Sequence, residues 1–193
     1  MPKFSVVKGE VNLAKELSDI DIFVLKCAEI ISKYTEYVIV SGYVAIFFGR
    51  SRASEDVDIF IKEMTVEDFH KMYHEFVANG FEWLIDNPEE LYKEYLKKGT
   101  PIGVWEKNFP LLRLDMKFPK EFSQRALFND KFKVVFGKHH LWMASIESTI
   151  AYKEEIAKSD KDMLDSRHLR LVFENLDKEK IETYKKLFNK EFH

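Results

Sequence analysis

Two aspartates at alternate positions, Asp56 and Asp58, are the residues of this sequence best suited to metal chemistry. They stand at the start of the β-prone run at residues 57–61, Asp56 directly before it and Asp58 within it, and alternate side chains of a strand point to the same face. Two carboxylates held side by side repel each other unless a cation neutralises them. Carboxylate oxygens are hard ligands that favour Mg²⁺ or Mn²⁺ over Zn²⁺. The pair therefore predicts a divalent metal site, and the alternative is two surface carboxylates on an edge strand.

A third carboxylate, Asp115, stands in a second β-prone run at residues 111–117. Its neighbours Leu114 and Met116 alternate with it and are expected to face the core. If this strand pairs beside residues 57–61, Asp115 completes a cluster of three carboxylates. Two metal ions about 3.5–4 Å apart in such a cluster would clamp the attacking and leaving oxygens of an in-line phosphoryl displacement. The alternative for Asp115 is an exposed or salt-bridged side chain.

Small residues precede the aspartate pair. Ser41 and Gly42 follow the β-rich run at residues 37–40 and precede a short helical run at 43–48. Small side chains let a phosphate approach the backbone, and a helix N-terminus presents unpaired N–H groups. The turn at Ser41 and Gly42 is therefore a candidate phosphate site.

Two arginines, Arg50 and Arg52, lie between this turn and the aspartates. Arginine forks bind phosphate oxygens at two points and can stabilise charge on a leaving pyrophosphate. The alternative is surface ion pairing with Glu55 or Glu63.

These segments together resemble the motif of the nucleotidyltransferase superfamily related to DNA polymerase beta. That motif has a hydrophobic residue, Gly, then Gly or Ser, and later a carboxylate–hydrophobic–carboxylate triplet. The matching residues here are Val40-Ser41-Gly42 and Asp56-Val57-Asp58. Residues 49–58 are especially similar to small prokaryotic members of the abortive-infection toxin type. The sequence departs from the pattern at Ser41, where the first glycine is usual, and Tyr43 adds a bulky side chain after the turn.

The resemblance continues downstream, where Lys153 and the segment Lys161-Asp162-Met163-Leu164-Asp165 are similar to a lysine helix and a Lys-Asp-x-x-Asp helix of those members. It implies that Lys153 contacts the triphosphate and that Lys161, Asp162 and Asp165 help to order the site. The alternative for Lys153 is a solvated helix lysine among neighbouring glutamates.

By this resemblance the protein is expected to be a nucleotidyltransferase dependent on Mg²⁺ or Mn²⁺. It would move a nucleoside monophosphate from an NTP to an acceptor hydroxyl or phosphate and release pyrophosphate, with Asp115 helping to deprotonate or position the acceptor. The acceptor candidates are a tRNA end, a protein side chain and a small molecule such as an aminoglycoside. The alternatives are a catalytically silent nucleotide-binding or antitoxin-like interaction module, and a structural homodimer.

Strands and helices alternate up to about residue 140, and only helices follow. Strands are expected at residues 37–40, 57–61, 101–105, 111–118 and 132–136, and helices at 17–34, 43–48, 65–79, 87–99, 145–158, 160–174 and 177–192. This order predicts an α/β (α+β) fold with a mixed β-sheet nucleotidyltransferase core at 1–140, flanked by helices. A C-terminal helical subdomain at 141–193 is expected to pack on that core.

Composition limits the class of protein. The net charge of −3 argues against a long nucleic-acid footprint, and one cysteine, Cys27, excludes an internal disulfide.

No apolar run reaches the ~20 residues of a membrane span, and the N-terminus lacks a signal-peptide core, so a cytoplasmic protein is expected. The 33% of charged residues with a single glutamine resembles the bias of hyperthermophile proteins. His70 and His74 have the i, i+4 spacing of helical zinc ligands but lack the catalytic glutamate, so a solvated face is favoured.

Overall fold

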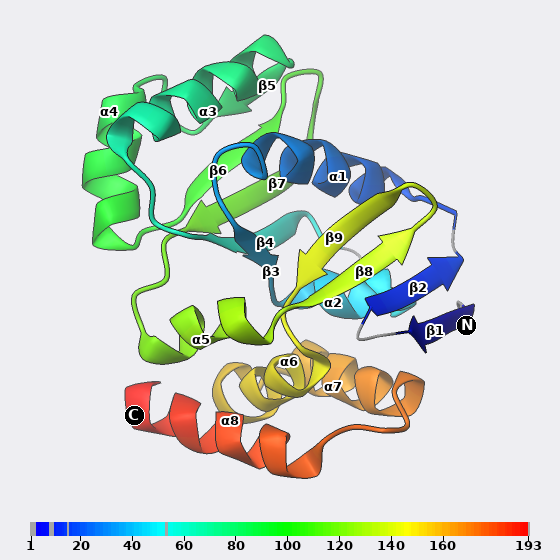
Figure 1. Cartoon of the computed structure of the whole chain (residues 1–193). Helices are drawn as coiled ribbons and strands as arrows, with labels where there is room; N and C mark the ends of the chain where they lie inside the picture. The colour runs from blue at the N-terminus through cyan, green and yellow to red at the C-terminus, as the bar shows by residue number, and fades with distance from the viewer. Residues whose placement is uncertain (1–2, 8–9, 15, 53, 193) are drawn as a thin grey trace. The chain divides into compact units, whose positions relative to one another are not determined.

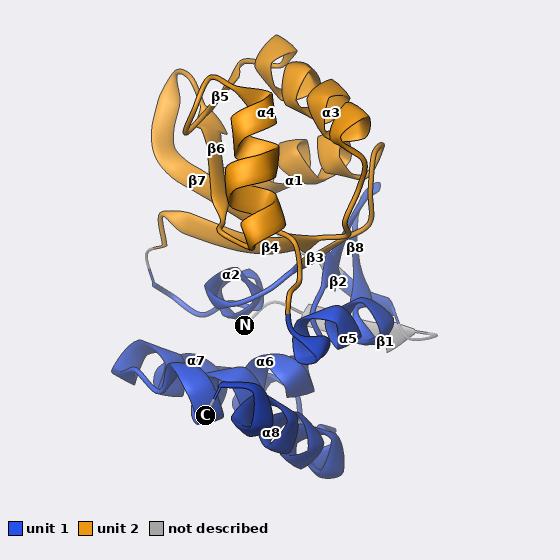
Figure 2. Cartoon of the chain, turned by 90° about the vertical axis from the view of Figure 1, so that its left-hand side faces the viewer, with its two compact units in different colours: residues 1–15, 39–53, 121–193 blue, residues 16–38, 54–120 orange. Residues whose placement is uncertain are grey.

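The computed structural model describes residues 3–7, 10–14, 16–52 and 54–192, and the chain divides into two compact units (Figure 2). Unit 1 comprises residues 1–15, 39–53 and 121–193, and unit 2 comprises residues 16–38 and 54–120. These units divide the chain differently from the core at 1–140 and helical subdomain at 141–193 expected from the sequence, and that division stays a prediction.

The C-terminal helices belong to unit 1 because aromatic packing joins them to earlier segments. The ring of Phe48 lies 4.9 Å from that of Phe173 and 6.2 Å from that of Phe132, measured between centroids. A change in element type along the sequence thus does not mark a change of packing unit.

Unit 1 contains a mixed sheet with helices around it (Figure 1). β2 pairs antiparallel with β1 and parallel with β8, β8 pairs antiparallel with β9, and β9 pairs parallel with the end of β3 at Ile39. These strands are β1 (Lys3–Val7), β2 (Glu10–Ala14), β3 (Tyr37–Ile39), β8 (Phe132–Phe136) and β9 (His139–Met143).

The helices of unit 1 are α2 (Gly42–Phe47), α5 (Phe122–Asp130), α6 (Ile146–Tyr152), a π-helical turn η3 (Lys153–Ala157), α7 (Asp160–Val172) and α8 (Lys178–Phe192). Ser145 caps α6 by accepting from the Ser148 amide, and Ser159 caps α7 in the same way. Ile181, Tyr184 and Phe188 of α8 are buried, and α8 packs on α6.

Unit 2 contains a second mixed set of strands, in the order β4-β7-β6-β5. β4 and β7 are parallel, whereas β7–β6 and β6–β5 are antiparallel. The strands are β4 (Asp56–Ile61), β5 (Phe81–Trp83), β6 (Ile102–Glu106) and β7 (Phe109–Lys117).

The helical elements of unit 2 are α1 (Asp19–Ile31), α3 (Val66–Ala78), α4 (Pro88–Glu90), and the short turns η1 (Leu91–Tyr95) and η2 (Leu96–Lys98). α1 packs on α3 and β7, and α3 packs on β5 through the rings of Phe76, Phe81 and Trp83. This packing buries the apolar faces of the strands.

Both units combine parallel and antiparallel strand pairs with flanking helices, so the predicted mixed α/β class is confirmed. β1, β2, β5, β9 and α5 were not predicted from the sequence. His139 and His140 pair with β8 as the start of β9. Of the described helices, none combines the length and apolar character that crossing a bilayer requires.

Glu154 ties three elements of unit 1 together. Its carboxylate accepts hydrogen bonds from Ser166 Oγ at 2.5 Å and from Arg170 Nε at 2.8 Å, and Lys185 Nζ lies 2.9 Å away. Burial alone would raise the pKa of Glu154, but these hydrogen bonds outweigh burial and lower the pKa to about 2. The contacts link η3 to α7 and α8.

Glu154 is expected to make stability depend on pH in the acid range. The folded-state pKa is depressed, so the unfolded chain binds the proton more readily and stability rises with pH between the two values. The stabilisation is complete above the ordinary pKa of 4.5 and is lost as pH falls towards about 2. The free energy of unfolding, measured with urea between pH 2 and 6, should therefore fall more steeply towards acid pH for the wild type than for Glu154→Gln. Equal slopes would contradict the assignment.

Candidate functional site

The three predicted acidic residues lie on two adjacent parallel strands of unit 2. β7 pairs beside β4 with Asp58 opposite Asp115 and Asp56 opposite Arg113. The strand pairing that the predicted cluster requires is therefore present.

The acidic side chains turn away from the core. Val57 and Ile59, which alternate with the aspartates, are buried, whereas the side chain of Asp56 is 53% exposed and that of Asp115 is 17% exposed. Asp58 is half-buried. The strand period has thus separated an apolar face from an acidic one, as predicted.

Arg113, which the sequence analysis did not single out, lies on the same face of β7. Its Nη2 is 3.2 Å from Asp56 Oδ1 and 2.8 Å from Asp115 Oδ2, and its Nε is 2.8 Å from Asp115 Oδ1. The hydrogen bond to Asp115 and the charges of the nearby carboxylates raise the pKa of Arg113. The guanidinium group therefore stays charged and bridges two of the three predicted ligands.

The donor set suits a hard divalent cation, because it consists of carboxylates without thiol or imidazole. Within the described part of the chain, however, no three His, Cys, Asp or Glu side chains are gathered as an ion would require. Arg113 engages two of the carboxylates. The residues fit Mg²⁺ or Mn²⁺ in chemistry, provided that Arg113 releases them.

The predicted phosphate turn lies in unit 1 and has an unusual backbone. Ser41 has φ 65° and ψ −138°, and Gly42 begins α2. A Cβ atom at Gly42 would lie 1.9 Å from Nη2 of Arg52, so the guanidinium group packs directly on this glycine. The structure thus brings together Gly42 and Arg52, two of the residues predicted to hold phosphate.

Replacing Ser41 with glycine is expected to stabilise the protein. A residue other than glycine with such positive φ stores about 1–3 kcal/mol of strain, of which glycine's larger unfolded-state entropy offsets a part. A net gain of about 1 kcal/mol corresponds to a melting temperature higher by roughly 2–4 °C. Differential scanning calorimetry of Ser41→Gly measures this shift, and Ser41→Ala serves as the control that keeps the strain. A Ser41→Gly variant no more stable than Ser41→Ala would contradict the strain argument.

Arg50 and Arg52 pair with a buried carboxylate of α7 rather than with the nearby glutamates of the alternative interpretation. Arg50 Nε lies 3.6 Å from Asp165 Oδ1, and Arg52 Nη2 lies 3.3 Å from Asp165 Oδ2. Glu63, one of the partners considered, pairs with Lys97. The two arginines are therefore held by α7.

Lys153 is buried, so the interpretation as a solvated helix lysine is wrong. Its Nζ donates to Asp162 Oδ1 and Asp165 Oδ2, both at 2.9 Å, and its side chain is 2% exposed. The structure thus gives Lys153 a positioning contact with α7, and direct phosphate binding by Lys153 stays a prediction. Lys161, predicted to help order the site, is exposed.

The cluster formed by Arg50, Arg52, Lys153, Asp162 and Asp165 carries three cations against two carboxylates. Burial alone would raise the pKa of Asp162, but hydrogen bonds from Ser159 and Lys153 outweigh burial and lower it. The arginine side chains are 24% and 16% exposed, so they reach the surface. One positive charge in excess is available there to an anion.

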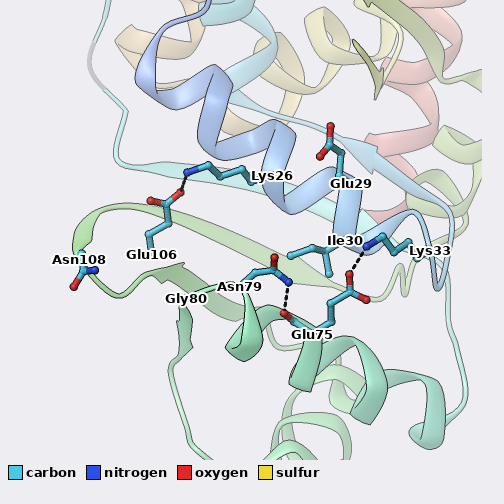
Figure 3. Close-up of a pocket in the computed structure, with 9 residues that line it drawn as sticks. All are labelled: Lys26, Glu29, Ile30, Lys33, Glu75, Asn79, Gly80, Glu106 and Asn108. Atoms are coloured by element: carbon cyan, nitrogen blue, oxygen red, sulfur yellow. Dashed lines mark hydrogen bonds and ion pairs between the residues drawn. The ribbon is translucent and has the colours of Figure 1, made fainter. Parts of the chain in front are cut away.

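Unit 2 also contains a cavity of about 390 Å³ lined by residues of α1, α3 and the β6–β7 turn (Figure 3). Two ion pairs cross it, Lys26–Glu106 at 2.7 Å and Lys33–Glu75. None of the predicted site residues lines this cavity. Both lysines that line it are paired with carboxylates, so it is not the candidate site.

No family model and no curated protein sequence matches the chain. Solved structures do match. The lincosamide antibiotic adenylyltransferase LnuA, with lincomycin bound, has a TM-score of 0.51 and 10% identity over 82% of this chain and 100% of its own. An antigenic nucleotidyltransferase-like protein from Paracoccidioides brasiliensis has a TM-score of 0.52 and 15% identity over 88% of this chain and 86% of its own. The chain therefore has the nucleotidyltransferase fold, and similarity to the abortive-infection toxin type stays a prediction.

Proposed function

We propose that the protein is a metal-dependent nucleotidyltransferase, which moves a nucleoside monophosphate from an NTP to an acceptor and releases pyrophosphate. The observation that carries the proposal is the placement of Asp56, Asp58 and Asp115 on adjacent parallel strands, within a chain of nucleotidyltransferase fold. Neighbouring carboxylates repel each other, so a bound divalent cation would stabilise this arrangement.

The three aspartates are the residues proposed to hold Mg²⁺ or Mn²⁺. A bound divalent ion would act as a Lewis acid on phosphate oxygens and offset the charge that develops there. The excess positive charge of the cluster around Asp165 supports the assignment of Arg50 and Arg52 to the triphosphate. Ser41 and Gly42 are proposed to lie against the phosphates as well.

In the proposed reaction, an acceptor oxygen attacks the α-phosphorus in line. A new phosphorus–oxygen bond forms as the bond between the α-phosphorus and the bridging oxygen breaks, and pyrophosphate leaves with that oxygen. The acceptor proton passes to a carboxylate, for which we propose Asp115. The arginines offset the negative charge of the leaving pyrophosphate.

The acceptor is proposed to be a small hydroxylated molecule, with a tRNA end or a protein side chain as the other candidates. LnuA, whose structure is similar, is a lincosamide antibiotic adenylyltransferase, which supports an acceptor of low molecular weight. The net charge of −3 also favours an acceptor that needs little phosphate contact.

Incubation with each of the four α-labelled NTPs tests the proposal. Cell RNA, protein lysate and a small-molecule extract are supplied in separate reactions, with Mg²⁺ or with EDTA. We expect Mg²⁺-dependent label in one fraction. Tight NTP binding without transfer would instead indicate a nucleotide-binding module, and the absence of both NTP binding and transfer would overturn the proposal.

A further inference from the structure

Arg113 lies where a cation of the acidic cluster is needed. Its guanidinium group contacts both oxygens of Asp115 and one oxygen of Asp56. These contacts come from residues 113, 115 and 56, which the β4–β7 register places side by side. The arginine therefore pairs with two of the three carboxylates proposed to hold a divalent ion.

The surroundings of Arg113 allow this contact and also its release. Gly103 of β6 stands opposite Asp115, and a Cβ atom there would lie 2.9 Å from Arg113 Cδ and 3.1 Å from Asp115 Oδ1. Glycine thus leaves the space in which the arginine folds over the carboxylate. Because the Arg113 side chain is 47% exposed, its head group can leave for solvent without unpacking the core.

From these contacts we propose that Arg113 is a resident cation of the acidic cluster, which neutralises Asp56 and Asp115 before metal arrives and which the divalent ion must displace. The inference rests on the proposed function, because it concerns the proposed metal ligands. Displacement costs the Arg113 ion pairs, so the apparent metal affinity of the protein is lower than the carboxylates alone would give.

Mn²⁺ binding to the full chain tests this inference, with free Mn²⁺ measured by electron paramagnetic resonance. Arg113→Met removes the competing cation but keeps an unbranched side chain. We expect it to bind Mn²⁺ about tenfold more tightly than the wild type, the equivalent of two partly exposed ion pairs. Arg113→Lys keeps the charge without the fork and should give an intermediate affinity.

Lys107→Met is the matched control. It removes one positive charge from unit 2 at a lysine that is 67% exposed and whose nearest carboxylate, on Glu82, lies 3.6 Å away. Wild-type affinity is expected for this variant. A similar gain in Mn²⁺ affinity from Lys107→Met would assign the effect to net charge and overturn the inference.

A second measurement reports the metal-free state. Without Mn²⁺, Arg113→Met should melt at a lower temperature than the wild type, because its carboxylates repel one another. Saturating Mn²⁺ should raise its melting temperature more than that of the wild type. If Arg113→Met has the Mn²⁺ affinity of the wild type, and Mn²⁺ raises the melting temperatures of both proteins equally, the inference is overturned.

Asp58→Asn separates the two possible failures. If the wild type binds Mn²⁺ and the Asp58→Asn variant does not, but Arg113→Met has the Mn²⁺ affinity of the wild type, only the role of Arg113 is wrong. If Mn²⁺ binding is absent or does not depend on Asp58, the metal site of the proposed function fails as well.

Discussion

Asp58→Asn is expected to abolish Mg²⁺-dependent NTP binding and to lower nucleotidyl transfer on the order of a thousandfold. Asp58 stands directly opposite Asp115 across two parallel strands, at the centre of the proposed ligand set. Asparagine keeps the shape of the side chain but removes its negative charge. Isothermal titration calorimetry with Mg²⁺ and a non-hydrolysable NTP measures binding, and label transfer measures the reaction.

Asp19→Asn is the matched control for this change. Asp19 lies in the first turn of α1, in the same unit, and is exposed. We expect it to bind and react as the wild type does. Wild-type binding and transfer by a folded Asp58→Asn protein, with an unchanged circular dichroism spectrum, would remove Asp58 from the site.

The sequence predicted the acidic face because alternation along a strand is a local property. Val57 and Leu114 are buried while Asp56 and Asp115 face outwards, as period two requires. The alignment of Asp58 with Asp115 could be predicted only on the condition that the two strands pair, because strand partners and register arise from the tertiary fold. The structure supplies that step.

Arg113 was missed although its position gave a signal. It precedes Asp115 by two residues and so lies on the same face of the strand. Its contact with Asp56 could not be derived, since that contact depends on the register between β4 and β7. A basic residue at i−2 from a candidate ligand is therefore worth considering as its counter-ion.

The short strands were missed for a different reason. β5 has three residues, Phe81–Trp83, and β9 begins with two histidines. A run of three residues is too short to show a strand period, and two histidines give no apolar alternation, so pairing with a neighbouring strand decides whether such runs become strands. Likewise, the burial of Lys153 follows from its partners on α7, which lie nine and twelve residues further along the chain.

Asp165→Asn is expected to destabilise the protein by about 3–5 kcal/mol, which is the cost of breaking a buried ion pair from one side. Asp165 is fully buried and faces Lys153, Arg50 and Arg52. The neutral amide would leave the buried ammonium group of Lys153 with Asp162 as its carboxylate partner. A melting temperature lower by on the order of 10 °C is expected, with a matching loss in urea unfolding.

The variant Asp160→Asn controls for the substitution itself. Asp160 lies on the same helix but is exposed, so its loss should cost less than about 1 kcal/mol. The double variant Asp165→Asn, Lys153→Met tests the pairing, because removing both charges should cost less than the sum of the single changes. Strict additivity would mean that the two charges do not stabilise each other. Asp165 would then keep α7 in place by contacts other than its ion pair with Lys153.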